Sequence, residues 1–243
     1  MMNTIDDVLA ELDAIVAAAL RDGDRLGYFA ALYRRVTRAV KVGIASGRFT
    51  DGERLGNLDV VFARRYVDAL TAYRAGSNVS RCWRVAFDAA VNPLPLVLQQ
   101  LLLGMNAHIN FDLGIATAAM NPPQSDFDEI NGILAEQVGA VESGLAEVSP
   151  AIGLLEKLDL RTETQIINFK LTKARDFAWA ASVRLRATPA FLVPGVEDGL
   201  DVAVGALGLA ILHPLPVIAV KLAPIRAVES NDVRAVLGVL ARD

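Results

Sequence analysis

Polar side chains with a regular spacing mark one place in the chain where chemistry could occur. Asn168, Thr172 and Asp176 each carry a side-chain oxygen and follow one another at intervals of four residues. Residues at i, i+4 and i+8 lie along one face of a helix, so their oxygens could approach a single cation. The stripe predicts either a solvated helix face or a cation site, depending on what lies opposite it.

A second set of polar residues interrupts the most apolar part of the chain. Within the 28 residues 93–120 the only formally charged side chain is that of Asp112, yet the segment also holds Asn106, His108 and Asn110. A helix this apolar is expected to run through the core, where a carboxylate must be paired, hydrogen-bonded or metal-bound.

Two interpretations of this second set follow. In a structural one, Asp112 accepts hydrogen bonds from His108 and from an arginine of another helix, while Asn106 and Asn110 form a polar seam. In a functional one, the same groups line a cavity, where Asp112 binds a metal or orients His108 as a general acid/base. Gly104, one turn earlier, leaves room either for a ligand or for a close helix crossing.

Three further side chains are candidates for contacting a substrate: Asp59, Tyr66 and Trp179. Each also has an ordinary structural explanation. Asp59 could stabilise the dipole of a helix in its first turns, and the two aromatic residues could belong to the core. Asp68 lies beside Arg64 and Arg65, which is typical of an ion pair on the surface.

The elements that must position these groups are helices. Apolar residues recur at intervals of three and four, and turn or cap signals such as Asn92-Pro93, Asn121-Pro122-Pro123 and Ser125-Asp126 separate the segments. With no long linker or repeat, we expect one all-α domain over residues 1–243, a helical bundle with an apolar interior. The expected helices cover roughly 4–21, 25–46, 54–75, 80–90, 94–119, 126–147, 150–157, 162–187, 197–212, 215–223 and 229–241.

The composition limits the classes of function. Of the 243 residues, 53% are hydrophobic, and the net charge of −4 comes with no dominant basic stripe, so no nucleic-acid partner is expected. The chain has one cysteine and two histidines, which argues against a disulfide or a zinc site. The acidic N-terminus lacks the pattern of a secretory signal, so we expect a cytoplasmic protein.

One segment has the length of a membrane span. Residues 202–220 carry no formal charge over 19 positions, but Pro214 and Pro216 interrupt them. We therefore expect a buried helix, a turn and a second short helix. A peripheral membrane contact stays as the alternative.

Asn168, Thr172, Arg175 and Asp176 together resemble the second metal-binding motif of class I terpene synthases. That motif has Asn or Asp, then Ser or Thr four residues later, then a basic and an acidic residue at positions eight and nine. The resemblance implies that the three oxygen ligands hold one Mg²⁺ and that Arg175 approaches a diphosphate. The family's Asp-Asp-x-x-Asp motif has its nearest counterpart here in residues 106–112, which offer one carboxylate. The alternative is that Arg175 and Asp176 form salt bridges inside a helix bundle.

A second resemblance covers more of the chain. Residues 60–70, 101–113 and 174–179 are similar to blocks of an uncharacterised bacterial domain-of-unknown-function family that is common in actinobacteria. This resemblance spans roughly residues 25–190. It implies a helical protein and names no reaction.

These observations lead to a working hypothesis with open alternatives. We expect an enzyme with an apolar pocket between the helices at 93–120 and 162–186, acting on an apolar small molecule. One version is an atypical terpenoid cyclase or prenyl-diphosphate lyase, in which Asp112 joins the stripe in holding Mg²⁺ and Arg175 binds diphosphate. Another version needs no metal and uses His108, oriented by Asp112, in an isomerisation, cyclisation or hydrolysis. Outside enzymes, the chain could be a lipid- or isoprenoid-binding module or a helical partner protein.

Overall fold

The computed structural model describes residues 2–130, 132–133 and 171–242. All regular structure in these residues is helical, which confirms the all-α class. The helical stretch that begins at Gln124 is described only in part, and the expected helix at 150–157 lies outside the described residues. The elements are α1 (Ile5–Asp22), α2 (Gly27–Ala45), α3 (Gly52–Arg74), α4 (Arg81–Val91), α5 (Val97–Met105), the π-helix η1 (Asn106–Leu113), α6 (Gly114–Met120), α9 (Leu171–Ala187), the short 3-10 helix η2 (Ala190–Leu192), α10 (Val193–Leu212), α11 (Pro216–Val228) and α12 (Val233–Leu240).

Local sequence signals set most of the helix boundaries. α1 begins at a capping box, in which Thr4 and Asp7 each bond the backbone N–H of the other. α3 begins after Asp51, whose side chain accepts from the backbone N–H of Arg54. α1 ends at Gly23, whose φ of 68° lies in the left-handed region that glycine adopts readily. These ends agree with the expected helices to within a few residues because caps act locally.

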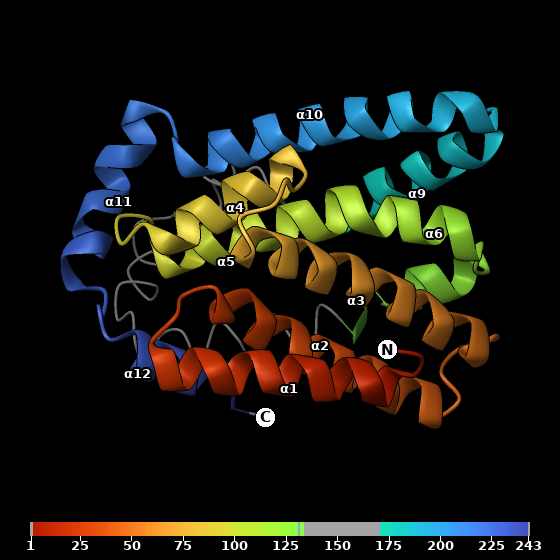
Figure 1. Cartoon of the computed structure of the whole chain (residues 1–243), viewed down its shortest axis with the longest axis horizontal. Helices are drawn as coiled ribbons and strands as arrows, with labels where there is room; N and C mark the ends of the chain where they lie inside the picture. Colours follow the sequence, from red (N-terminus) through yellow and green to blue (C-terminus); the bar gives the residue numbers. More distant parts are fainter. Residues whose placement is uncertain (1, 131, 134–170, 243) are drawn as a thin grey trace.

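The segments α5, η1 and α6 form one continuous rod through the centre of the molecule. Figure 1 shows this rod between α10 on one side and the pair α1 and α2 on the other. The C-terminal helix α12 returns to the first helices, where Arg234 donates to the backbone carbonyls of Leu20 and Arg21 at the end of α1. The rod starts at Val97, later than expected, since the prolines at 93 and 95 hold the preceding residues outside the helix.

The centre of the rod is a π-helix, a feature that the sequence analysis did not predict. All eight residues of η1 are buried. Hydrogen bonds from residue i to i+5 are rare in proteins and occur often at functional sites. Because Asn106, His108, Asn110 and Asp112 all lie in η1, the unusual backbone and the unusual side chains coincide.

Close helix crossings fix the rod against its neighbours. A Cβ atom added at Gly104 would lie 2.5 Å from Cδ2 of Phe29, a side chain of α2. One added at Gly114 would lie 3.2 Å from the carbonyl oxygen of Ala178 in α9. Gly104 is therefore explained by a close helix crossing, one of the two alternatives that the sequence left open.

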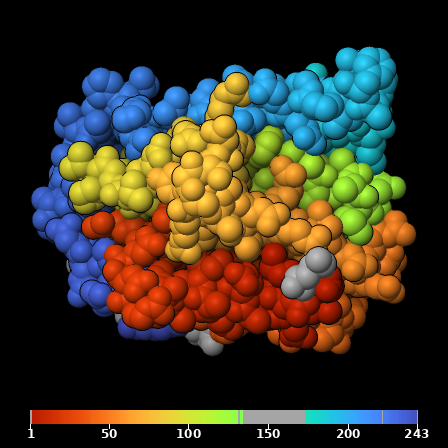
Figure 2. Space-filling view, viewed as in Figure 1, coloured from red at the N-terminus to blue at the C-terminus, as the bar shows by residue number. Residues whose placement is uncertain are grey.

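The apolar segment 202–220 is divided as expected but is not buried throughout. α10 ends at Leu212 and α11 begins at Pro216. One face of α10 is buried, whereas Val202 and Leu209 are about half exposed, and Leu215 and Val220 at the turn and in α11 are more exposed still. Figure 2 shows these blue helices along the top and the left of the molecule. The expectation of a buried helix is correct for one face only.

Within the described ranges, no helix taken alone has both the length and the apolar composition of a membrane span. Ala190–Leu212 and Pro216–Val228 meet both criteria only as a pair, with a bend of 44° between them.

Candidate functional site

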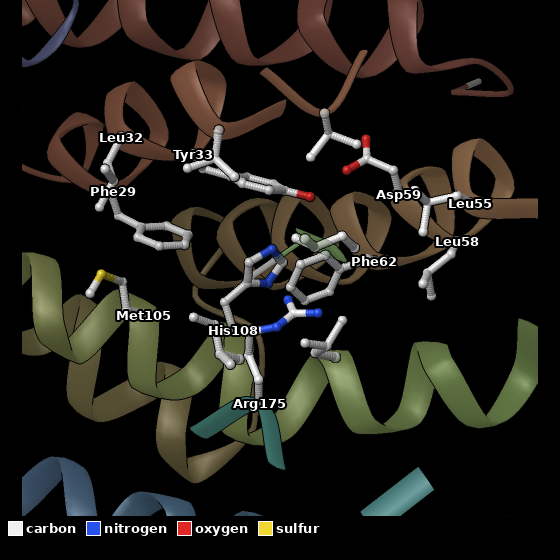
Figure 3. Close-up of a pocket in the computed structure, with 15 residues that line it drawn as sticks. Phe29, Leu32, Tyr33, Leu55, Leu58, Asp59, Phe62, Met105, His108 and Arg175 are labelled. Carbon is white, nitrogen blue, oxygen red and sulfur yellow. The ribbon is translucent and has the colours of Figure 1, made fainter. Parts of the chain in front are cut away.

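An apolar cavity of about 90 Å³ lies where α2, α3, η1 and α9 meet. Figure 3 shows its walls. Four of the described lining residues carry polar or ionisable groups, namely Tyr33, Asp59, His108 and Arg175. The remainder are apolar: Phe29, Leu32, Val36, Val40, Leu55, Leu58, Phe62, Met105, Ile109, Leu113 and Ile130.

Asp112 is the buried carboxylate that holds His108 in place. Its Oδ1 accepts from Nε of Arg65 at 2.9 Å, and its Oδ2 accepts from Nε1 of Trp83 at 2.8 Å. Nδ1 of His108 lies 3.2 Å from the same Oδ2. Arg65 and Trp83 can only donate, so they stabilise the carboxylate as an acceptor, and we assign the shared proton to Nδ1 of His108.

The contacts of Asp112 confirm the structural interpretation, in which the carboxylate is held by His108 and by an arginine of another helix. They also correct the expectation for Arg65. This residue of α3 points inward to Asp112 and does not belong to an ion pair on the surface with Asp68. A buried carboxylate needs donors, but the sequence alone does not identify which helix supplies them.

His108 is neutral because it is buried. Burial lowers the pKa of its imidazole, and this effect outweighs the opposing influence of Asp112. Phe62 stacks on the ring with centroids 3.5 Å apart, and Tyr33 packs against it edge-on at 4.5 Å. Among the described residues, Nε2 has no hydrogen-bond partner. The cavity wall therefore presents an unprotonated ring nitrogen with an available lone pair.

Asp59 places a second unsatisfied polar group on the cavity. Its Oδ2 is buried with no partner in the described part of the chain, and burial raises the pKa of its carboxyl to about 7. α3 begins at Gly52, so Asp59 lies two turns inside the helix. At this position it does not stabilise the helix dipole, as an acid in the first turn would. A carboxyl with this pKa is partly protonated at neutral pH and can donate a hydrogen bond.

Tyr33 lies next to Asp59 on the same side of the cavity. Figure 3 shows its hydroxyl pointing toward the Asp59 carboxyl, with His108 and Arg175 on the other side. Burial raises the pKa of the Tyr33 phenol well above 10, so the hydroxyl stays protonated. Thr37 lies near the hydroxyl, but among the described side and main chains no partner meets the geometry of a hydrogen bond.

Arg175 brings a buried positive charge to the cavity. Only 3% of the residue is exposed, and burial lowers the pKa of the guanidinium to about 10. Nη2 donates to the carbonyl oxygen of Phe127, and the guanidinium lies over the Phe127 ring at 4.3 Å from its centroid. Nε has no partner, and no ion pair joins Arg175 to a described carboxylate. The alternative of a salt bridge inside the bundle is thus not observed for Arg175.

Asn106 and Asn110 face away from the cavity lining. Nδ2 of Asn110 donates to Oδ1 of Asn106 at 2.9 Å, and Nδ2 of Asn106 donates to the carbonyl oxygen of Val204 in α10, also at 2.9 Å. These bonds form the polar seam of the structural interpretation. They fasten η1 to α10 and leave His108 and Asp112 as the pair directed toward the cavity and α3.

Tyr66 and Trp179 are placed as core aromatics. Tyr66 is fully buried and packs edge-on against Phe29, with ring centroids 5.1 Å apart. Trp179 is half-buried against Phe127, with centroids 5.0 Å apart. Neither residue is among the described lining of the cavity, so their expected contact with a substrate stays a prediction.

The proposed magnesium ligands fall on parts of the chain that differ in exposure. Asp176 is exposed, whereas Asp112 is almost completely buried and bonded to protein donors. Asn168 lies outside the described residues, as does the side chain of Thr172. Within the described part of the chain, no three or more His, Cys, Asp or Glu side chains are grouped as metal ligands would be. The magnesium site stays a prediction of the sequence motif alone.

Sequence reasoning missed the contribution of α2 to the site. Phe29, Leu32, Tyr33, Val36 and Val40 occupy one helical face and line one wall of the cavity. A tyrosine in an otherwise apolar stripe was the available signal, since a buried hydroxyl requires a partner.

The fold and the site define an all-α protein with an apolar cavity, to which four polar or ionisable side chains contribute. The chain belongs to the family of unknown function DUF5995, whose model matches residues 5–214. The match confirms the expected uncharacterised family, over a longer stretch than residues 25–190, and it covers every described residue of the cavity lining. Comparisons with curated proteins and with solved structures found no match. The resemblance to class I terpene synthases stays a prediction.

Proposed function

We propose that this protein is an enzyme that moves a proton within a small, largely apolar molecule, with His108 as the base. The observation that carries the proposal is the state of His108. Its Nδ1 is occupied by Asp112, and its Nε2 is a free acceptor on the wall of an apolar cavity. A neutral imidazole oriented in this way is the most common general base in enzymes.

The rest of the cavity supports proton transfer over other reactions. Its described lining contains no serine, cysteine or lysine that could form a covalent intermediate. Its volume of about 90 Å³ is small compared with pockets for drug-sized ligands, which are roughly 300–1,000 Å³. These features favour isomerisation of a small substrate over hydrolysis and over cyclisation of a prenyl chain.

The arrangement suggests how the proton would move. Nε2 of His108 takes a proton from a carbon next to a carbonyl group, and the electron pair of the broken C–H bond forms a carbon–carbon double bond as the carbonyl oxygen becomes negative. Asp112 is the positioning residue that stabilises the imidazolium. Neutral Asp59 donates a hydrogen bond to the oxygen, as a carboxylic acid in an apolar site can do. Where the substrate has a carbon–carbon double bond one bond beyond that carbon, return of the proton from His108 to the far end of this double bond moves it into conjugation, re-forms the carbonyl group and restores the base.

Deuterium exchange tests the proposal without knowledge of the natural substrate. The protein would be incubated in D2O with cyclopentanone, acetone or levulinate, and loss of the C–H signals beside the carbonyl would be followed by proton NMR. We expect exchange faster than buffer alone in the wild type and in His213→Gln, whose exposed histidine is the matched control. We expect no such acceleration in His108→Gln. Equal rates in wild type and His108→Gln would contradict the proposal.

A further inference from the structure

We infer that the molecule bound in this cavity carries a carboxylate and that Arg175 binds it. The inference rests on the proposed function, because it assigns the substrate class to the same cavity. It goes further, because it predicts discrimination between a small acid and its uncharged counterpart.

No ion pair joins Arg175 to a carboxylate of the described walls. The acids that influence its guanidinium are Asp128 and Asp176, and both are exposed to solvent. Asp59 lies on the same cavity, but burial raises the pKa of its carboxyl to about 7, and no ion pair joins it to Arg175 among the described residues. Asp112 is already paired with Arg65. A buried cation without a partner is unfavourable for folding, so its retention here points to an anionic ligand.

The geometry of Arg175 is that of a prepared binding group. Phe127 holds the guanidinium twice, through its carbonyl oxygen and through its ring. These contacts fix the plane of the guanidinium and leave Nε buried without a described partner, on a residue that lines the cavity. A fixed, planar guanidinium matches the two oxygens of a carboxylate.

The other wall groups favour one anionic charge and an apolar body. His108 is neutral, and Tyr33 offers a protonated hydroxyl. Asp59 can accept a proton when an anion binds nearby, which removes its repulsion. One cation and a volume of about 90 Å³ suit a short monocarboxylic acid better than a diphosphate.

Matched ligands test this inference by NMR titration and thermal shift. Butyrate and levulinate would be compared with the uncharged butanol and methyl levulinate at up to about 10 mM, where a Kd of about 1 mM is detected. We expect the wild type to bind the acids at least about tenfold more tightly than the uncharged compounds. Arg175→Met, which keeps an unbranched stem but lacks the guanidinium, should lose that preference while still binding the uncharged compounds. Arg184→Met, at an exposed arginine of the same helix, should keep it.

The melting temperature of the unliganded variant separates loss of binding from loss of folding. Because Arg175 is a buried charge with no described carboxylate partner, Arg175→Met is expected to melt at or above the wild-type temperature. If Arg175→Met does not fold, Arg175→Lys serves in its place. Lysine keeps the charge but cannot present a planar pair of donors. We expect Arg175→Lys to bind the acids at least about tenfold more weakly than the wild type.

The outcomes distinguish the inference from the proposed function. Absence of acid binding, or the same preference for acids in wild type and Arg175→Met, overturns the inference. Binding of acids through Arg175 without deuterium exchange supports the inference and contradicts the proton-transfer function. Exchange that needs His108 but is as fast for methyl levulinate as for levulinate supports the function and overturns the inference.

Discussion

Nδ1 of His108 lies 3.2 Å from Oδ2 of Asp112, one turn further along the same buried π-helix. The same helix carries a second i, i+4 pair, Asn106 and Asn110, which bonds to α10. One short element thus serves two purposes. The asparagine pair fastens the helix in the bundle, and the histidine pair leaves a ring nitrogen free at a cavity.

Replacement of Asp112 by asparagine should destabilise the protein. The change removes the negative charge that pairs with Arg65. It also leaves one acceptor oxygen in place of the two that Trp83, Arg65 and His108 contact in the wild type. Loss of one partner from a buried ion pair costs on the order of 3 kcal/mol. Urea unfolding of Asp112→Asn would measure this loss in the free energy of unfolding. Asp176→Asn, at an exposed acid, is the control, with an expected effect within about 0.5 kcal/mol. Equal effects at the two positions would refute the structural assignment of Asp112.

Replacement of Asp59 by asparagine should change how stability depends on pH. In the folded protein burial raises the pKa of Asp59 to about 7, from the ordinary value of 3.8. The folded state therefore holds a proton that the unfolded chain releases between pH 4 and 7, and the contribution of Asp59 to stability falls as pH rises through this interval. Above pH 7 the contribution of Asp59 to stability stays low.

The comparison with Asp59→Asn isolates this contribution. Asparagine has the same shape and no charge, so the variant should be more stable than wild type by on the order of a few kcal/mol at pH 8, with a much smaller difference at pH 4. Chemical unfolding at both pH values gives the two differences. A difference that does not change with pH would show that Asp59 is not held protonated by its surroundings.

Gly104 should not tolerate a side chain. An added Cβ would lie 2.5 Å from Cδ2 and 2.9 Å from Cβ of Phe29, which packs edge-on against His108. Gly104→Ala is expected to lower stability by about 1–3 kcal/mol and to shift the NMR signals of His108. Gly199→Ala in α10 is the control, since nothing lies within 4 Å of its added Cβ. There the gain in helix propensity should stabilise the protein by about 0.8–1.0 kcal/mol. A stabilised Gly104→Ala would contradict the close crossing of α2 and α5.

Magnesium and diphosphate should have no joint effect on the melting temperature. Asp112 lies in protein hydrogen bonds and Asp176 is exposed, and the proton transfer proposed for His108 uses no metal. A thermal-shift titration with Mg²⁺ and inorganic diphosphate on wild type and Asp176→Ala tests this directly, since ligands that bind the native state raise the melting temperature. A shift that needs both ligands and disappears in Asp176→Ala would restore the prenyl-diphosphate hypothesis.

The parts of the fold that the sequence predicted are those set by local interactions. The start of α1 at a capping box and the break between α10 and α11 at prolines depend on a few neighbouring residues. The pairing of Asp112 with His108 was also expected, since both lie on one helix at i, i+4. These features require no knowledge of how helices pack.

The parts that the sequence did not predict depend on tertiary packing. Arg65 and Trp83 reach Asp112 from other helices, and Tyr33 reaches the cavity from α2. Neither composition nor periodicity specifies which helical faces meet. The π-helix was missed for a different reason, because the change from i+4 to i+5 bonding has no local signal comparable to a cap.

The state of His108 is the central claim, and nitrogen NMR of the imidazole tests it most directly. The chain has two histidines, so in His213→Gln the only imidazole signals are those of His108. At pH 7 we predict a neutral ring with the proton on Nδ1 and none on Nε2, and a shift of the Nε2 signal when levulinate binds. A proton on Nε2 at pH 7, in either the neutral or the charged ring, would contradict the account.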